Sequence, residues 1–146
     1  MLMKQISLKK LDYYFYNRSN RIPNIPFLTY PGAMDCLKDL SELKCGSGLY
    51  FQIFFWLSQI CHHLRTLKIS LESVISHGLM NLISVQQNLK YLGLYNYSNC
   101  KDLSMILDSL IKLVNTLIKL KLHGIGSYES LSFLTRFTNL QKLVFF

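Results

Sequence analysis

The sequence predicts an α/β fold in which short parallel strands alternate with helices as a leucine-rich-repeat solenoid. The 146 residues contain 28 leucines but a single alanine, Ala33, a bias that an ordinary helical bundle does not need. A Leu-x-x-Leu-x-apolar hexamer also recurs, with successive starts 32, 24, 25, 28 and 23 residues apart. Four of these intervals fall within the roughly 20 to 29 residues of leucine-rich repeats. The six hexamers are Leu8–Tyr13, Leu40–Cys45, Leu64–Ile69, Leu89–Leu94, Leu117–Leu122 and Leu140–Phe145.

Each hexamer is expected to form a strand, because side chains alternate between the two faces of a sheet. The fourth and sixth positions, both apolar, are then buried. The third, fifth and seventh positions point away from the core. In a leucine-rich repeat the strands line a concave face while the chain returns along a convex face as a helix, so we expect one domain over residues 1–146 with helices on the convex face.

The first interval differs from the others. Residues 18–32 contain Pro23, Pro26 and Pro31, which one continuous helix cannot accommodate. We therefore predict an irregular N-terminal repeat over residues 1–45 and regular repeats over residues 46–146.

The four later intervals carry apolar residues at helical spacing. Side chains at positions i, i+3, i+4 and i+7 share one face of a helix, so each interval predicts one helix packed on the sheet. Asn99 with Asp102, and Ser127, are placed to cap the last two helices. The residues expected to face inward are Ile53, Trp56, Leu57, Ile60 and Cys61, then Leu79, Leu82 and Ile83, then Leu103, Ile106, Leu107, Leu110, Ile111 and Val114, and finally Leu131, Leu134 and Phe137.

The turns after the strands lack one feature that many leucine-rich repeats share. Asn or Cys often stands three residues beyond the sixth hexamer position and satisfies the turn backbone. Here that position holds other residues, so irregular turns are expected; they are Tyr16, Gly48, Glu72, Tyr97 and Ile125.

Four segments spread along the chain share the pattern of one family. They are Tyr30–Cys36 leading into Leu40–Cys45, then Ile60–Leu67, Gln87–Leu94 and Phe137–Leu143. Together they resemble the fungal F-box-like leucine-rich-repeat proteins over nearly the whole chain. The resemblance implies a repeat region that holds a protein for ubiquitination, while an N-terminal F-box docks on the linker subunit of a cullin-type ligase. No F-box-like segment precedes Leu8 in these residues, so the resemblance predicts a repeat fragment or a truncated relative, which contacts the linker only if an F-box lies upstream.

Composition excludes several classes of protein. Lys4, Lys9 and Lys10 interrupt what would be a secretory core, and the most apolar stretch, residues 49–61, is shorter than the roughly 18 residues of a membrane span. We read that stretch as a buried helix and expect no membrane association. The four cysteines have no CxxC spacing, so reduced thiols in a cytoplasmic or nuclear protein are expected.

No catalytic or cofactor motif emerges from the residues. Cys61, His62 and His63 are adjacent, but neighbouring side chains do not converge on one metal without distant partners, and no third group orients a Cys-His nucleophile. Gly124 and Gly126 follow a predicted strand, yet Glu129 occupies the third glycine position of a dinucleotide-binding turn. We therefore expect no enzyme activity, no metal and no cofactor.

The outward strand positions supply the candidate binding site. They contain six lysines and only two acidic residues, and they mix amphipathic tyrosines with one sign of charge. Together with a net charge of +8, this predicts a protein-recognition module for a partner with an acidic surface. A basic solenoid that binds nucleic acid or another polyanion is the alternative, although no nucleic-acid motif is present. The predicted contact residues are Lys10, Lys44, Lys68, Tyr91, Tyr95, Lys119, Lys121, His123 and Lys142.

Overall fold

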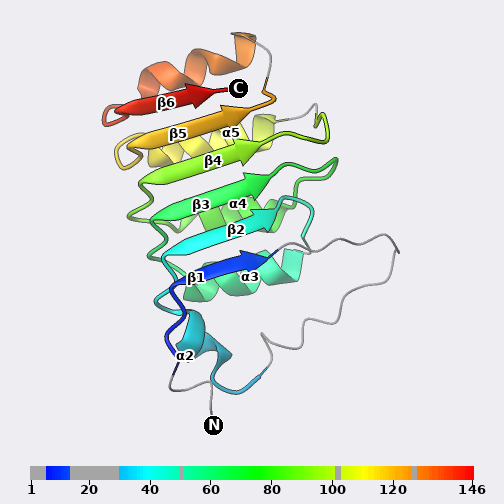
Figure 1. Cartoon of the computed structure of the whole chain (residues 1–146), viewed down its shortest axis with the longest axis vertical. Coiled ribbons are helices and arrows are strands. Elements are labelled where there is room, and N and C mark those ends of the chain that lie inside the picture. Colours follow the sequence, from blue (N-terminus) through cyan, green and yellow to red (C-terminus); the bar gives the residue numbers. More distant parts are fainter. Residues whose placement is uncertain (1–5, 14–29, 50, 101–102, 126–127) are drawn as a thin grey trace.

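A computed structural model describes residues 6–13, 30–49, 51–100, 103–125 and 128–146. In these ranges the strands form one six-stranded sheet in the order β1 to β6, with every neighbouring pair parallel (Figure 1). Each strand begins at the third position of a predicted hexamer, so the α/β class and all six strands are confirmed. The strands are β1 (Lys10–Tyr13), β2 (Glu42–Gly46), β3 (Thr66–Ser70), β4 (Tyr91–Tyr95), β5 (Lys119–His123) and β6 (Lys142–Phe145).

The repeated hexamer sets the register of the sheet. The fourth hexamer positions pair with one another across all six strands, and those of the four central strands are fully buried leucines. Because the side-chain period of a strand is two, this register places every apolar position on the same face. The fully buried leucines of this ladder are Leu43, Leu67, Leu92 and Leu120.

Helices cover the apolar face of the sheet. The long connections after β2, β3 and β4 form α3 (Phe51–Ile60), α4 (His77–Ser84) and α5 (Ser104–Leu110), which lie behind the sheet in Figure 1. The 3₁₀ segment η2 (Ile111–Leu113) extends α5, the 3₁₀ helix η3 (Tyr128–Arg136) precedes β6, and the short α2 (Ala33–Leu37) precedes β2. None of these elements covers the opposite face of the sheet.

The inward face of α3 differs from the prediction at Trp56. This side chain is 42% exposed, whereas Phe54 is fully buried. Phe54 takes the inner position because α4 approaches closely: a Cβ at Gly78 would lie 2.8 Å from both the Phe54 Cβ and the Phe51 carbonyl oxygen. Trp56 lies about 200° around the helix from Phe54, so residues 51–60 form a half-exposed helix rather than a buried one.

The structure tests the predicted helix caps only in part. Leu103 precedes α5 and provides no side-chain cap, while Asn99 adopts a left-handed conformation with φ of 52° in the turn before it. Asp102 and Ser127 lie outside the described residues, as does most of the predicted irregular loop. Among the helices whose preceding residue is described, only α4 has a side-chain cap, where Ser76 accepts a hydrogen bond from the Gly78 N–H at 3.3 Å.

The first residue of each turn after β2 to β5 continues the ladder of the sheet, whereas positive φ falls at Asn99 in one turn and at Gly124 in the next. At four successive turns, the N–H group two residues beyond the hexamer donates to the carbonyl of the seventh position in the next strand, at 2.8 to 3.0 Å. The amide of Asn96 also bonds the Cys100 N–H at 2.8 Å and the Gly124 carbonyl at 3.3 Å. In this turn the side chain that bonds the backbone therefore stands one position earlier than in many leucine-rich repeats. The four donor residues are Ser47, Leu71, Asn96 and Gly124.

Candidate functional site

The outward strand positions form three rows across the sheet, which we call the uncovered face. The strand register aligns the third, fifth and seventh hexamer positions of neighbouring strands. At the strand spacing of about 4.8 Å, side chains in one row are close neighbours. From β2 to β5 the rows read Glu42, Thr66, Tyr91 and Lys119; then Lys44, Lys68, Gly93 and Lys121; then Gly46, Ser70, Tyr95 and His123.

The β1 to β3 half of the uncovered face is compensated in charge. Glu42 lies 3.3 Å from the Lys10 Nζ and 3.4 Å from the Lys68 Nζ, and Lys44 lies 3.3 Å from Asp12. Burial alone would raise the pKa of Glu42, but the hydrogen bonds and charges of Lys10 and Lys68 outweigh it and lower that pKa. Both acidic residues of the face are therefore engaged, and they engage three of its lysines.

The β4 to β6 half carries lysines without acidic partners. Within the described ranges, Lys119, Lys121 and Lys142 form no ion pair. Instead, the Lys119 Nζ lies 5.0 Å from the ring centroid of Tyr91, and the Lys121 Nζ lies 5.2 Å from that of Tyr95. These are cation–π distances, so the rings hold two uncompensated ammonium groups on this half of the sheet.

Gly93 determines how the tyrosines lie. A Cβ at Gly93 would be 2.8 Å from the Tyr95 Cε2 and 3.0 Å from its hydroxyl oxygen, so the Tyr95 ring lies across the strand in the space that Gly93 leaves. The hydroxyl groups of Tyr91 and Tyr95 are then 3.3 Å apart and share a hydrogen bond. Burial first, and then this hydrogen bond, raise the pKa of Tyr91.

A cluster of rings continues from Tyr95 at the carboxyl ends of the strands. The Tyr97 ring stacks on Tyr95 with centroids 6.1 Å apart, and its centroid is 4.8 Å from that of His123. Phe146 lies on the other side, 6.1 Å from His123. Tyr97 and Phe146 are 68% and 71% exposed. We call the combined surface the aromatic–lysine patch; it comprises Tyr91, Tyr95, Tyr97, Lys119, Lys121, His123 and Phe146.

The structure places seven of the nine predicted contact residues in two groups. Five of them gather in the aromatic–lysine patch, while Lys10 and Lys44 lie in the compensated half. Lys68 joins the two halves, because it binds Glu42 and lies 5.6 Å from the ring centroid of Tyr91. Lys142 is exposed on β6, beside Lys119 in the register. The five gathered residues are Tyr91, Tyr95, Lys119, Lys121 and His123.

Sequence reasoning missed Tyr97 and the role of Gly93. The hexamer pattern makes Tyr97 a turn position, although it continues the alternation of Tyr91, Gly93 and Tyr95, and that alternation is the available signal. No sequence pattern shows that a ring lies over a glycine. Phe146 is the seventh, outward position of the last hexamer, but it is not among the predicted contact residues.

The adjacent Cys61, His62 and His63 do not form a reactive site. Cys61 is fully buried, its thiol donates to the Leu37 carbonyl at 3.4 Å, and burial raises its pKa to about 12. A nucleophilic cysteine needs a lowered pKa and access to solvent. Across the described ranges, no three His, Cys, Asp or Glu side chains are grouped so that they could hold a metal ion.

Gly124 has a structural role in its turn. Its φ is +67°, and a Cβ there would collide with the Asn96 carbonyl oxygen. The turn therefore requires glycine for close backbone approach, while Gly126 lies outside the described residues. This favours the turn interpretation of the Gly124 segment over a phosphate-binding loop.

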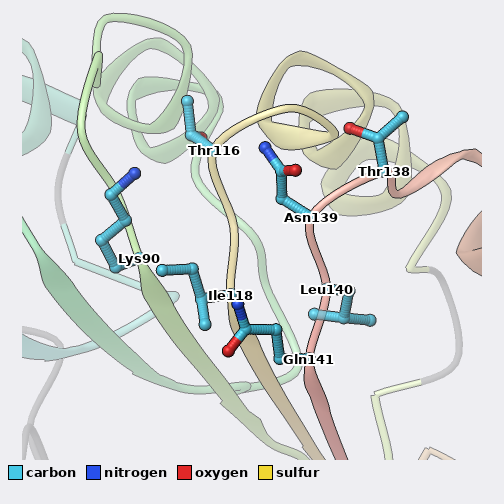
Figure 2. A pocket seen from close by; sticks show the side chains of 7 residues that line it. All are labelled: Lys90, Thr116, Ile118, Thr138, Asn139, Leu140 and Gln141. Atoms are coloured by element: carbon cyan, nitrogen blue, oxygen red, sulfur yellow. The ribbon is translucent and has the colours of Figure 1, made fainter.

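A groove of about 280 Å³ lies at the amino ends of β4, β5 and β6, at the end of these strands opposite to the ring cluster (Figure 2). Two of its lining residues, Thr138 and Asn139, already donate hydrogen bonds to Asn115. The groove is smaller than the roughly 300 to 1,000 Å³ of typical ligand pockets, and its only charged side chain is Lys90. Its lining residues are Lys90, Thr116, Ile118, Thr138, Asn139, Leu140 and Gln141.

Comparison with models of protein families, with curated proteins and with solved structures gives no significant match to the chain. Among the helices of the described ranges, none combines the length and the apolar character needed to cross a membrane.

Proposed function

We propose that the chain is a non-enzymatic protein-recognition module that binds a partner with an acidic surface through the aromatic–lysine patch. The observation that carries this proposal is the placement of Lys119 and Lys121 over the rings of Tyr91 and Tyr95, with no carboxylate paired to either lysine in the described part of the chain. Amphipathic rings beside one sign of charge favour binding of the opposite charge.

A leucine-rich-repeat solenoid is part of this proposal. Six hexamers in one parallel register, with helices on one face, support it, and the uncovered face then corresponds to the concave surface of the solenoid. The resemblance to F-box-like proteins adds a role as the substrate-binding region of a ubiquitin-ligase adaptor. That role requires an F-box segment, which would contact the cullin linker subunit. Cys36, Cys45 and Cys61, which form no disulfide, favour the reducing cytoplasm or nucleus.

The two residue types contribute differently to binding. Exposed charges chiefly raise the encounter rate and make it depend on salt. Aromatic side chains bury apolar area and extend the lifetime of the complex. We therefore expect Tyr91→Ala or Tyr95→Ala to weaken a partner by about 1 to 3 kcal/mol, and Lys119→Glu with Lys121→Glu to lower the association rate and its salt dependence.

A peptide selection tests the proposal. A phage library of random twelve-residue peptides is selected on the chain, and the enriched peptides are then measured against the double variant Lys119→Glu, Lys121→Glu. We expect enrichment of Asp and Glu, and loss of binding to the double variant. Lys112→Glu is the matched control, because Lys112 is an exposed lysine on the helix-covered side and its reversal changes net charge without changing the patch.

Three outcomes would contradict the proposal. The enriched peptides would lack acidic residues, they would bind the double variant as well as the unaltered chain, or Lys112→Glu would weaken them equally. Tighter binding of a single-stranded oligothymidylate than of any selected peptide, with a steep salt dependence, would instead favour the nucleic-acid alternative.

A further inference from the structure

We infer that the partner carries an aromatic side chain next to its acidic residues. Tyr97, His123 and Phe146 form the binding site, or seat, for that aromatic side chain. This inference rests on the proposed function and specifies the chemistry of the partner. The three rings form an aromatic shelf at the carboxyl ends of β4, β5 and β6, directly beside the ammonium group of Lys121.

Exposure and geometry together indicate a binding surface. Tyr97 and Phe146 are the two most exposed large apolar side chains of the described residues, at 68% and 71%. They flank the His123 ring at centroid distances of 4.8 and 6.1 Å. A flat aromatic side chain is the group that buries the most area against such rings and gains stacking or edge contacts with them.

The shelf does not fit a cationic ligand. The Lys121 Nζ already lies 4.8 Å from the ring centroid of Phe146 and 5.2 Å from that of Tyr95, so the cation–π position beside these rings is occupied by the chain itself. A second cation would be repelled there. An aromatic group flanked by carboxylates meets both features, because its ring contacts the shelf while a carboxylate pairs with Lys121.

The shelf rings also contact their neighbours without a partner. Tyr97 contacts both Tyr95, at 6.1 Å between centroids, and His123, and the Tyr95 ring is in turn seated over Gly93. Rings held by their neighbours lose little freedom when a partner docks. The exposed rings are therefore suited to act as an anchor site rather than as mobile surface side chains.

Three synthetic peptides of equal length test the inference on the full chain by fluorescence anisotropy. One alternates Glu with Trp, one alternates Glu with Ala, and one alternates Gln with Trp. We expect the Glu–Trp peptide to bind about tenfold more tightly than the Glu–Ala peptide, which is the size of a modest aromatic anchor. Tyr97→Ala should abolish that difference between the Glu–Trp and Glu–Ala peptides, and Tyr97→Phe, which keeps the ring, should restore it.

The outcomes separate this inference from the proposed function. If both acidic peptides bind equally well and Lys119→Glu with Lys121→Glu weakens both, the proposed function stands and the aromatic seat is wrong. If neither acidic peptide binds, or if the Gln–Trp peptide binds as tightly as the Glu–Trp peptide, the acidic partner itself is wrong and the inference fails with it. If Tyr97→Ala prefers the Glu–Trp peptide over the Glu–Ala peptide as strongly as the unaltered chain does, the aromatic seat is also wrong.

Discussion

Gly93 is the residue on which the tyrosine arrangement depends. It interrupts the row of lysines between Lys68 and Lys121, and the Tyr95 ring fills the space that its missing side chain leaves. Glycine inside a strand costs about 0.5 to 1 kcal/mol relative to alanine. Here the glycine leaves room for the Tyr95 ring, whose hydroxyl group is within hydrogen-bond distance of the Tyr91 hydroxyl group.

We expect Gly93→Ala to displace the Tyr95 ring without unfolding the chain, because the ring lies on the uncovered face and can rotate away from a new Cβ. Loss of the hydrogen bond to Tyr95 removes one cause of the raised pKa of Tyr91. The pKa of Tyr91 should therefore move down toward its ordinary value, as measured by NMR titration of ¹³C-labelled tyrosine rings.

Gly48→Ala is not a suitable control for this change, because a Cβ at Gly48 would meet the Glu72 carboxylate. Ser70→Ala serves instead, since Ser70 is an outward position on the neighbouring strand β3. An unchanged Tyr91 titration in Gly93→Ala would show that Gly93 does not position Tyr95.

Glu72 offers a test of pH dependence. Its carboxylate lies against Gly46 and Gly48, and burial raises its pKa. Because the folded pKa exceeds the unfolded value of about 4.3, the stability contribution is complete below that pH and is lost as pH rises through the folded pKa. Glu72→Gln should therefore raise the free energy of unfolding at pH 7, and the gain should vanish toward pH 4, as measured by urea denaturation.

Glu42→Gln provides a control of opposite sign. Lys10 and Lys68 lower the pKa of Glu42, so its contribution is present above the unfolded pKa and is lost as pH falls. Removing this charge should lower stability at pH 7. Equal effects of the two substitutions at pH 7 would contradict the burial and pairing described for these carboxylates.

At the scale of elements, the strands were predictable and the helices were only partly so. The hexamer fixes the inward positions of a strand because their period is two, as Leu43, Leu67 and Leu92 demonstrate. The face of α3 was not determined in this way. Seven of its ten residues are apolar, and the close approach of Gly78 selects Phe54 over Trp56 for the interior. That selection depends on the packing of two helices, which no local pattern records.

A buried glutamine connects successive repeats. Gln86 is 6% exposed; its amide oxygen accepts from the Leu64 N–H at 3.0 Å, and its amide nitrogen donates to the carbonyl oxygens of Cys61 at 2.6 Å and Leu82 at 3.0 Å. Gln86→Ala leaves these backbone groups buried and unpaired. We expect a loss of about 2 to 4 kcal/mol in the free energy of unfolding, measured by chemical denaturation.

The neighbouring Gln87 is exposed and supplies the matched control. Gln87→Ala should change stability by less than about 0.5 kcal/mol. A similar small effect from Gln86→Ala would mean that water or a rearranged turn satisfies the backbone groups, and that the glutamine does not hold the two repeats together.

At the scale of the whole molecule, the β6 end of the sheet differs from its centre. Leu143 and Phe145 of β6 are 40% and 45% exposed, whereas the corresponding leucines of β5, Leu120 and Leu122, are at most 1% exposed. An uncovered last strand exposes both apolar side chains and a pairing edge. We expect residues 1–146 to self-associate at high concentration, and Leu143→Lys with Phe145→Lys to reduce that association in sedimentation velocity.

Phe55→Lys on α3 controls for the removal of an exposed ring elsewhere, since Phe55 is 42% exposed on the other side of the sheet. It should leave self-association unchanged. A chain that scatters light as a monomer at high concentration would contradict the role given to β6.

The sequence predicts how many charged residues lie at outward positions, but not where on the sheet the uncompensated lysines gather. Six lysines and two acidic residues at outward positions follow from the sequence. Both acids engage Lys10, Lys44 and Lys68, which concentrates the uncompensated lysines beside the rings of β4 and β5. Ion pairing depends on which strands are neighbours, so the location of the patch emerges only from the assembled sheet.

An NMR titration tests most directly whether the aromatic–lysine patch is the recognition surface. The labelled chain is titrated with an acidic peptide from the selection, and the ring signals of Tyr91, Tyr95 and Tyr97 are compared with the indole signal of Trp56. Trp56 is the only tryptophan, and it is exposed on α3, on the other side of the sheet. We expect the three tyrosine rings to shift with peptide while the indole signal stays constant. A shift of the indole with unchanged tyrosine signals would place recognition on the helices and contradict the assignment.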